Sequence, residues 1–161
     1  VDHASPATAY YLAAYLFMNL GAFGVAGQLE RTVGSDRINA LRGLGRRSAG
    51  AAAVLALSLL SLAGIPPLAG FAGKVLLLEA SVAGGMLWLA IVAAVNMTIA
   101  LFYYLSVIAE IYLKRSEHEF TLSIGKGYTA GYALVLVGTL FLGIWPGPNL
   151  QVAQVATNLF R

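Results

Sequence analysis

One charged residue lies in an apolar run where a charge is unexpected. Lys74 follows the apolar residues 71–72 and Gly73, and it precedes a further apolar run over residues 75–78. A lysine near the centre of a bilayer costs at least about 2.5 kcal/mol, so it is expected to face water, a carboxylate or another helix. A lysine held between burial and a carboxylate can gain and lose a proton, which is the chemistry of a proton relay. We therefore interpret Lys74 as a candidate proton-translocating residue. The alternative is a lysine that extends toward the membrane surface.

The residues just before Lys74 cannot form a continuous helix. Pro66 and Pro67 lack backbone N–H groups, and their rings clash with preceding carbonyls. Glycines add backbone freedom around them, at Gly64, Gly70 and Gly73. In lipid the freed carbonyls need other partners, so broken helices occur where they are buried in protein or line a hydrated cavity, and they mark transport sites. The spacing predicts a discontinuous helix that positions Lys74.

Other polar residues inside the apolar runs form a candidate secondary polar path. They are Ser61, Asn96 and Glu110. Packing between helices is the commoner use of small and polar residues in lipid, and it is the alternative for Ser61 and Asn96. Glu110 lies near Lys114, so an ion pair at the membrane surface is the simpler interpretation of this carboxylate. Glu79 is interpreted as a surface carboxylate near the opposite face.

No group of residues in the sequence indicates an enzyme active site. The chain has no cysteine, which excludes disulfides and cysteine-bound iron–sulfur clusters. Its two histidines, His3 and His118, lie outside the apolar runs, so neither a haem-binding pair nor a metal-ligand cluster is expected. The glycine-rich segment has neither the preceding strand nor the spacing of a phosphate-binding loop. We therefore expect no catalytic residue, bound cofactor or metal in this chain.

The composition places most of the chain in lipid. Hydrophobic residues make up 59% of the sequence, charged residues only 11%, and the mean hydropathy is +0.78. Soluble domains carry about 25% charged residues. A helix needs roughly 20 apolar residues to cross the hydrocarbon, and four stretches approach this length. They predict transmembrane helices over about residues 7–28, 49–82, 85–113 and 129–145.

The predicted fold is therefore an all-α polytopic membrane protein with four transmembrane helices. The second helix is discontinuous at residues 64–67, and the last is stopped by Pro146 and Pro148. Residues 149–161 alternate apolar side chains with Gln and Asn, which indicates an interfacial helix or a packed end. All of residues 1–161 are assigned to one transmembrane domain.

The basic residues predict the orientation of these helices. Lysine and arginine gather in the loops 29–48 and 114–128, which lie on one face of the membrane. By the positive-inside rule these loops are cytoplasmic, and both chain ends lie on the opposite side. This topology accounts for the net charge of +3 better than a nucleic-acid partner does. Residues 1–3 show no basic region before an apolar core, so no signal peptide is predicted.

A family resemblance rests on the broken helix. The segment SLAGIPPLAGFAGK, residues 61–74, resembles the late broken helix of the antiporter-like subunits of respiratory complex I, NADH:quinone oxidoreductase. Three further segments support the resemblance: YLFMNLGAFGV at 15–25, FYYLSVI at 102–108 and GIWP at 143–146. The likeness covers essentially the whole chain and is greatest to the C-terminal part of the subunit N family, the counterpart of mitochondrial NADH dehydrogenase subunit 2.

The resemblance implies an inverted-repeat, antiporter-like fold and a role in proton translocation coupled to electron transfer from NADH to quinone. It assigns Lys74 to the lysine of the second repeat, on the central hydrophilic axis of the membrane arm. FMN, iron–sulfur clusters and quinone are expected in other subunits. The implied partners are lipid, the other membrane-arm subunits, and the first repeat, carried by the remainder of the same subunit or by a separate chain. The implied location is an energy-transducing membrane, a bacterial plasma membrane.

Two alternatives stay open at this point. A subunit of a multisubunit Na⁺/H⁺ antiporter or of a membrane-bound hydrogenase resembles this sequence equally well around Lys74. A structural membrane subunit would use the break only to accommodate a neighbouring helix. An intramembrane enzyme is disfavoured because no nucleophile lies at a usable spacing from a base.

Overall fold

The computed structural model describes residues 4–35, 37–115, 122 and 125–158, and the described elements are all helices. In chain order they are α1 (Ala4–Val33), the 3-10 helix η1 (Ile38–Leu41), α2 (Leu44–Arg47), α3 (Ala49–Ala63), α4 (Ala69–Ala83), α5 (Leu87–Tyr112), α6 (Lys126–Ile144) and α7 (Pro146–Asn158). The predicted all-α architecture is confirmed. His3, His118, residues 159–161 and much of the loop 114–128 lie outside the described residues.

Three described helices are long and apolar enough to cross a membrane. They are α1, α5 and α6, over Pro6–Val33, Leu87–Tyr112 and Gly127–Ile144. α3 and α4 have 15 residues each, and neither reaches the roughly 20 residues that a crossing needs. A fourth crossing therefore requires α3 and α4 together, and it stays a prediction.

Two helix ends differ from the predicted boundaries. α1 continues to Val33, past the predicted end at residue 28, because Leu29, Glu30 and Arg31 favour helix after the apolar run has ended. Pro146 begins α7 as well as following α6. Proline suits the first turn of a helix, where its missing N–H would have no partner within the helix.

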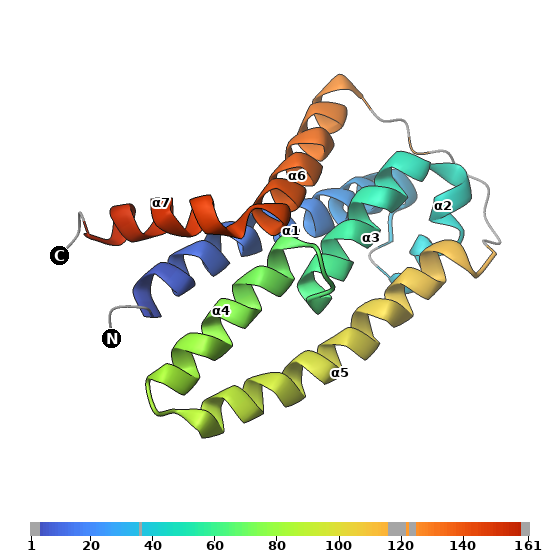
Figure 1. Cartoon of the computed structure of the whole chain (residues 1–161). Helices are drawn as coiled ribbons and strands as arrows, with labels where there is room; N and C mark the ends of the chain where they lie inside the picture. The colour runs from blue at the N-terminus through green and yellow to red at the C-terminus, as the bar shows by residue number, and fades with distance from the viewer. Residues whose placement is uncertain (1–3, 36, 116–121, 123–124, 159–161) are drawn as a thin grey trace.

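α1 forms the centre of the bundle. It packs against α3, α4, α6 and α7. Figure 1 shows α3 and α4 following one another, and α5 returning beside them at the edge of the molecule. At one end of the α1–α6 pair the Tyr10 hydroxyl donates to the Leu142 carbonyl, and at the other the Tyr132 hydroxyl donates to Gln28 Oε1. These contacts fix α1 and α6 as antiparallel neighbours.

Small residues let the helices around α1 approach closely. A Cβ at Gly21 of α1 would overlap the Ser58 hydroxyl of α3 and lie 2.7 Å from Val135 Cγ1 of α6. Such close contacts matter because lipid is as apolar as the side chains, so helices in lipid associate mainly by van der Waals packing and hydrogen bonds. Large apolar side chains such as Phe23 and Phe102, 72% and 76% exposed, lie on the outer faces, as a lipid-facing surface requires.

Candidate functional site

α3 ends at a glycine with a left-handed backbone. Gly64 has φ +88°, a conformation that side-chain-bearing residues rarely adopt. Its N–H donates to the carbonyls of Leu60 (3.1 Å) and Ser61 (3.0 Å), and the N–H of Ile65 donates to Leu60 (3.1 Å). These bonds close the helix and satisfy two of its last carbonyls.

The next two carbonyls of α3 have no helical donors, because prolines occupy the positions that would supply them. In a continuous helix the carbonyls of Leu62 and Ala63 would accept from the N–H groups four residues later, which are positions 66 and 67. Pro66 and Pro67 have no N–H. The two prolines therefore free two defined carbonyl oxygens at the end of α3.

Lys74 binds both of these carbonyls. Its Nζ donates to the Leu62 carbonyl at 2.6 Å and to the Ala63 carbonyl at 3.2 Å. The side chain is half-buried, and among the described residues Lys74 takes part in no ion pair. Gly64 leaves room for it, because a Cβ at position 64 would lie 3.1 Å from Lys74 Cδ and 3.4 Å from Nζ. The lysine of α4 thus replaces the backbone donors that the prolines remove from α3.

Ser61 and Gly70 join the two half-helices. The Gly70 N–H donates to Ser61 Oγ at 3.0 Å, and Ser61 is fully buried. This bond satisfies one of the N–H groups in the first turn of α4 that have no partner within the helix. A Cβ at Gly70 would overlap the Ser61 carbonyl oxygen and lie 3.0 Å from Met18 Sδ of α1. Ser61 therefore acts as a structural hydrogen-bond acceptor in this arrangement.

Two further glycines bring α1 and α6 against the broken helix. A Cβ at Gly73 would lie 3.0 Å from Tyr11 Cδ2 of α1. A Cβ at Gly143 of α6 would overlap the Pro67 carbonyl oxygen. The contact of Gly143 with the break was not predicted from the sequence. The only signal for it was the glycine in the GIWP segment.

An open cavity of about 280 Å³ lies beside the break. One wall is the break itself, and the other comes from α4 and α5; its lining residues are Ala63, Gly64, Ile65, Pro66, Leu78, Ala94, Met97, Thr98 and Leu101. Ala63 provides one of the two carbonyls that Lys74 binds. The broken helix therefore borders an open space that is lined mostly by apolar side chains.

Glu110 lies in a different place, at the end of α5 near the basic loops. Its carboxylate accepts from Arg42 Nε at 2.9 Å and pairs with Lys114 at 2.5 Å. The pair with Lys114 agrees with the simpler interpretation of Glu110. The pairing of Glu110 with Arg42 was not predicted from the sequence, because the two residues are 68 positions apart. Glu110 follows the cavity-lining Leu101 by nine residues, or about 14 Å along the helix.

Asn96 also points away from Lys74. It is exposed, whereas Ala94, Met97 and Leu101, on the other side of α5, line the cavity next to the break. The described residues therefore do not join Lys74, Asn96 and Glu110 into one path.

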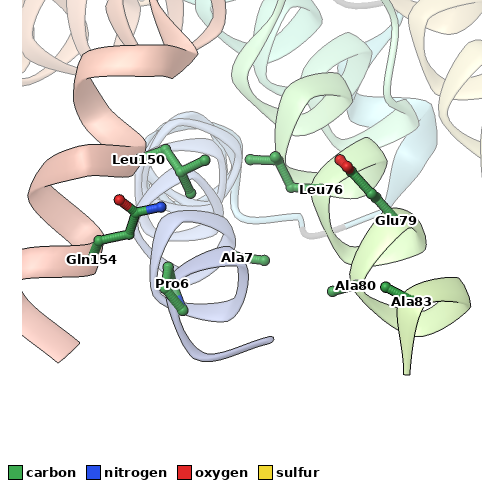
Figure 2. Close-up of a pocket in the computed structure, with 8 residues that line it drawn as sticks. All are labelled: Pro6, Ala7, Leu76, Glu79, Ala80, Ala83, Leu150 and Gln154. Atoms are coloured by element: carbon green, nitrogen blue, oxygen red, sulfur yellow. The ribbon is translucent and has the colours of Figure 1, made fainter. Parts of the chain in front are cut away.

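A second cleft, of about 310 Å³, lies between α1, α4 and α7. Figure 2 shows Ala7 on the side of α1 that faces Leu76 and Glu79 of α4, and Pro6 nearer Gln154 of α7. Glu79 is exposed and forms no ion pair among the described residues. Within the described part of the chain, no three His, Asp or Glu side chains gather as a metal site would require.

Comparison with known proteins places this broken-helix arrangement in a family. Residues 3–100 match the family described as NADH:quinone oxidoreductase/Mrp antiporter, TM. This chain belongs to that family. The match includes the whole of the broken helix and about the first half of α5, so the family resemblance drawn from residues 61–74 is confirmed.

Individual members of the antiporter family match most of this chain. The chain is 42% identical over 149 residues to NADH-quinone oxidoreductase subunit N of Desulfitobacterium hafniense, an overlap of 92% of this chain and 30% of that protein. It is 39% identical over 149 residues to subunit N of Heliobacterium modesticaldum, covering 92% of this chain and 32% of the relative. This chain therefore spans about a third of the length of these relatives.

A solved structure has the same fold. It is respiratory complex I from Thermus thermophilus with bound Aureothin, and one of its chains matches with a TM-score of 0.79 and 31% sequence identity. The match covers 91% of this chain and 34% of the Thermus chain. The predicted membrane fold of an antiporter-like subunit is thus confirmed, apart from the number of crossings.

Proposed function

We propose that this chain is part of a membrane-arm subunit of NADH:quinone oxidoreductase and that Lys74 takes part in proton translocation. The observation that carries the proposal is the contact of Lys74 Nζ with the Leu62 and Ala63 carbonyls. The bonds hold a protonatable amine at a helix break that borders an open cavity. The subunit N relatives supply the complex in which such a group would act.

The geometry supports proton exchange in two ways. The free carbonyls at the end of α3 carry the partial negative charge of a helix C-terminus, and this charge stabilises an ammonium group. Neighbouring carbonyls also accept N–H bonds from a neutral amine, so Lys74 keeps its position when the proton leaves. Water in the adjoining cavity would carry that proton away.

The reaction itself belongs to the assembled complex. In this proposal the chain is a non-redox part of a proton-translocating enzyme, and FMN, iron–sulfur clusters and quinone bind in other subunits. Its partners are lipid and the other membrane-arm subunits, including the segment that carries the first repeat. The membrane is a bacterial plasma membrane, with the loops 29–48 and 114–128 on the cytoplasmic side.

The test is Lys74→Met in the full-length subunit within the assembled complex. We expect proton pumping driven by NADH oxidation to fall by roughly tenfold or more, as loss of a proton-transfer group does, while the complex still assembles. Lys114→Met is the matched control, because Lys114 is 53% exposed and Glu110 keeps Arg42 as a partner. Full pumping and quinone reduction by Lys74→Met would show that the break has a structural role only.

The second candidate function is cation exchange in an antiporter complex. The description of the matched family names both NADH:quinone oxidoreductase and the Mrp antiporter, and this supports the candidate. Pumping assays with and without Na⁺ separate the two. Proton movement that requires Na⁺ and continues without NADH oxidation would favour the antiporter.

A further inference from the structure

The buried polar side chains of this chain gather at one place in the bundle. In the described part of the chain, and apart from tyrosines, they are Gln28, Ser48, Ser58, Ser61 and Thr139, which we call the polar column. Gln28 belongs to α1, the serines to α3 or the position just before it, and Thr139 to α6. These three helices pack against one another, whereas the cavity beside the break borders α4 and α5.

Contacts with α1 give the order of the serines along α3. A Cβ at Gly21 would overlap the Ser58 hydroxyl, so Ser58 lies beside Gly21. A Cβ at Gly70 would overlap the Ser61 carbonyl oxygen and lie 3.0 Å from Met18 Sδ, so Ser61 lies at the level of Met18. α1 and α3 are therefore antiparallel, and Ser61 lies about 4.5 Å nearer the break than Ser58.

Thr139 lies at nearly the same level as Ser61. A Cβ at Gly21 would also lie 2.7 Å from Val135 Cγ1 of α6, so Val135 and Ser58 flank the same residue of α1. Both α3 and α6 are antiparallel to α1, so they run in the same direction. Thr139 follows Val135 by one turn, or about 6 Å, and Ser61 follows Ser58 by three residues. The three hydroxyl side chains are thus consecutive steps toward the break.

The polar column extends from the basic loops to the lysine site. At the end with the basic loops, the Tyr132 hydroxyl donates to Gln28 Oε1, and Ser48 lies between the loop 29–48 and α3. At the other end, the column reaches the last residues of α3, where the Leu62 carbonyl accepts from Lys74 Nζ at 2.6 Å. The buried polar groups therefore lead toward the amine that the proposed function uses.

Three hydroxyls of the polar column have no partner among the described residues. They are Ser48 Oγ, Ser58 Oγ and Thr139 Oγ1, and all three atoms are buried. Other hydroxyls of the apolar helices donate to the carbonyl four residues earlier, as Ser81 does to Leu77 at 2.8 Å. A buried hydroxyl without a partner is destabilising, and internal water commonly bonds such groups. Because a hydroxyl both donates and accepts hydrogen bonds, hydroxyls alternating with water can pass protons along.

We propose that the polar column is the route by which protons pass between the basic-loop end of the bundle and Lys74, through water bonded to Ser58 and Thr139. The inference rests on the proposed proton exchange by Lys74. Each hydroxyl accepts a proton from water on one side as it gives its own proton to water on the other, so it is unchanged after the transfer. The neutral amine of Lys74 takes up the proton that arrives.

An apolar step divides the polar column. Gln28 follows Gly21 by seven residues, or about 10 Å along α1. Val25, on the same side of α1, is fully buried between them, and Leu55 of α3 is 4% exposed. Protons cross this step only when water enters it, which keeps the route from leaking protons at rest.

The test compares Thr139→Val with Thr139→Ser in the full-length subunit of the assembled complex. Valine keeps the shape of the side chain and removes the hydroxyl, whereas serine keeps the hydroxyl. We expect pumping per intact complex to fall at least about threefold in Thr139→Val, because a proton-transfer group is lost, and to stay at the wild-type level in Thr139→Ser. Ser58→Ala should behave like Thr139→Val. Its control is Ser106→Ala, because Ser106 donates to the Phe102 carbonyl of its own helix at 2.8 Å.

The outcomes separate this route from the role of Lys74. Wild-type pumping by either Thr139→Val or Ser58→Ala would overturn the proposal, and so would an equal loss in Thr139→Ser, because packing rather than the hydroxyl would then matter. If Lys74→Met pumps normally, the proposed function itself fails. If Lys74→Met stops pumping while Thr139→Val pumps normally, only the polar column is wrong.

Discussion

At the scale of single residues, the site depends on the match between one lysine and two carbonyls. Pro66 and Pro67 remove the donors for Leu62 and Ala63, and Lys74 Nζ provides new ones. The lysine therefore satisfies partly buried backbone carbonyls as well as carrying a charge. A substitution that removes the amine should affect both properties, and one that keeps the charge should separate them.

Lys74→Arg tests whether the charge or the exchangeable proton matters. A guanidinium remains protonated at all physiological pH values, so it can bind the carbonyls but cannot release a proton. We expect the assembled complex to form and its proton pumping to fall nearly as far as in Lys74→Met. Pumping at the wild-type rate by Lys74→Arg would mean that Lys74 contributes charge alone.

Gly64→Ala tests the backbone of the break. Position 64 has φ +88°, and a Cβ there would lie 3.1 Å from Lys74 Cδ. We expect a loss of stability of about 1–3 kcal/mol, measured as a lower temperature of thermal inactivation of the purified complex. Gly131→Ala in α6 is the control, because a Cβ there meets nothing within 4 Å and alanine favours helix. Equal behaviour of the two variants would contradict a strained glycine at the break.

At the scale of elements, the break is a joint in which each half-helix completes the other. α4 contributes Lys74 to the end of α3, and α3 contributes Ser61 Oγ to the first turn of α4. Gly70 and Gly143 allow α3 and α6 to approach the joint without a Cβ in the way. The two short helices thus behave as one element that keeps its backbone groups bonded without a continuous helix.

Ser61→Ala should weaken this joint. It leaves the buried Gly70 N–H without an acceptor, which costs about 1–3 kcal/mol. The measurement is the thermal stability of the complex. Ser81→Ala in α4 is the control, because Ser81 Oγ donates only to the Leu77 carbonyl of its own helix, at 2.8 Å. Removing the Ser81 hydroxyl therefore leaves no N–H group without an acceptor. If Ser61→Ala also stops pumping in a complex of normal stability, Ser61 belongs to the polar path rather than only to the joint.

At the scale of the whole molecule, α1 packs against most of the other helices, and ion pairs of Glu110 stabilise the end of the bundle that carries the basic loops. Arg42, from the segment between α1 and α3, binds Glu110 near the end of α5, and the Gly43 N–H donates to the Glu110 carbonyl at 3.2 Å. This contact closes the end of the molecule that carries the basic loops. The ion pair lies about 14 Å along α5 from Leu101, the last residue of α5 that lines the cavity beside the break.

Glu110→Gln tests whether that end takes part in proton movement. We expect a small effect on the yield of intact complex, less than about threefold, because partly exposed ion pairs contribute little. Pumping per assembled complex should be unchanged, since Glu110 and Lys74 do not meet. Arg42→Gln should give the same result for the same reason. Loss of pumping in Glu110→Gln but not in Arg42→Gln, with the complex intact, would show that Glu110 takes part in proton movement.

The sequence by itself determined the features that depend on neighbouring residues. The apolar runs predicted a helical membrane fold, and the prolines and glycines predicted a break before Lys74, because helix formation and its interruption are decided within a few residues. Which carbonyls lose their donors follows from local geometry, since Pro66 and Pro67 lie four residues after Leu62 and Ala63. That Lys74 is the group that binds these carbonyls was not predicted from the sequence.

Only the tertiary structure decided which distant groups meet. The pairing of Arg42 with Glu110 and the contact of Gly143 with the break join residues far apart in the chain. The outward face of Asn96 likewise depends on how the helices pack. An apolar helix is nearly uniform around its axis, so its sequence indicates that it enters the membrane but not which side faces a neighbour. That choice is made by close packing and by the few polar groups that must find partners.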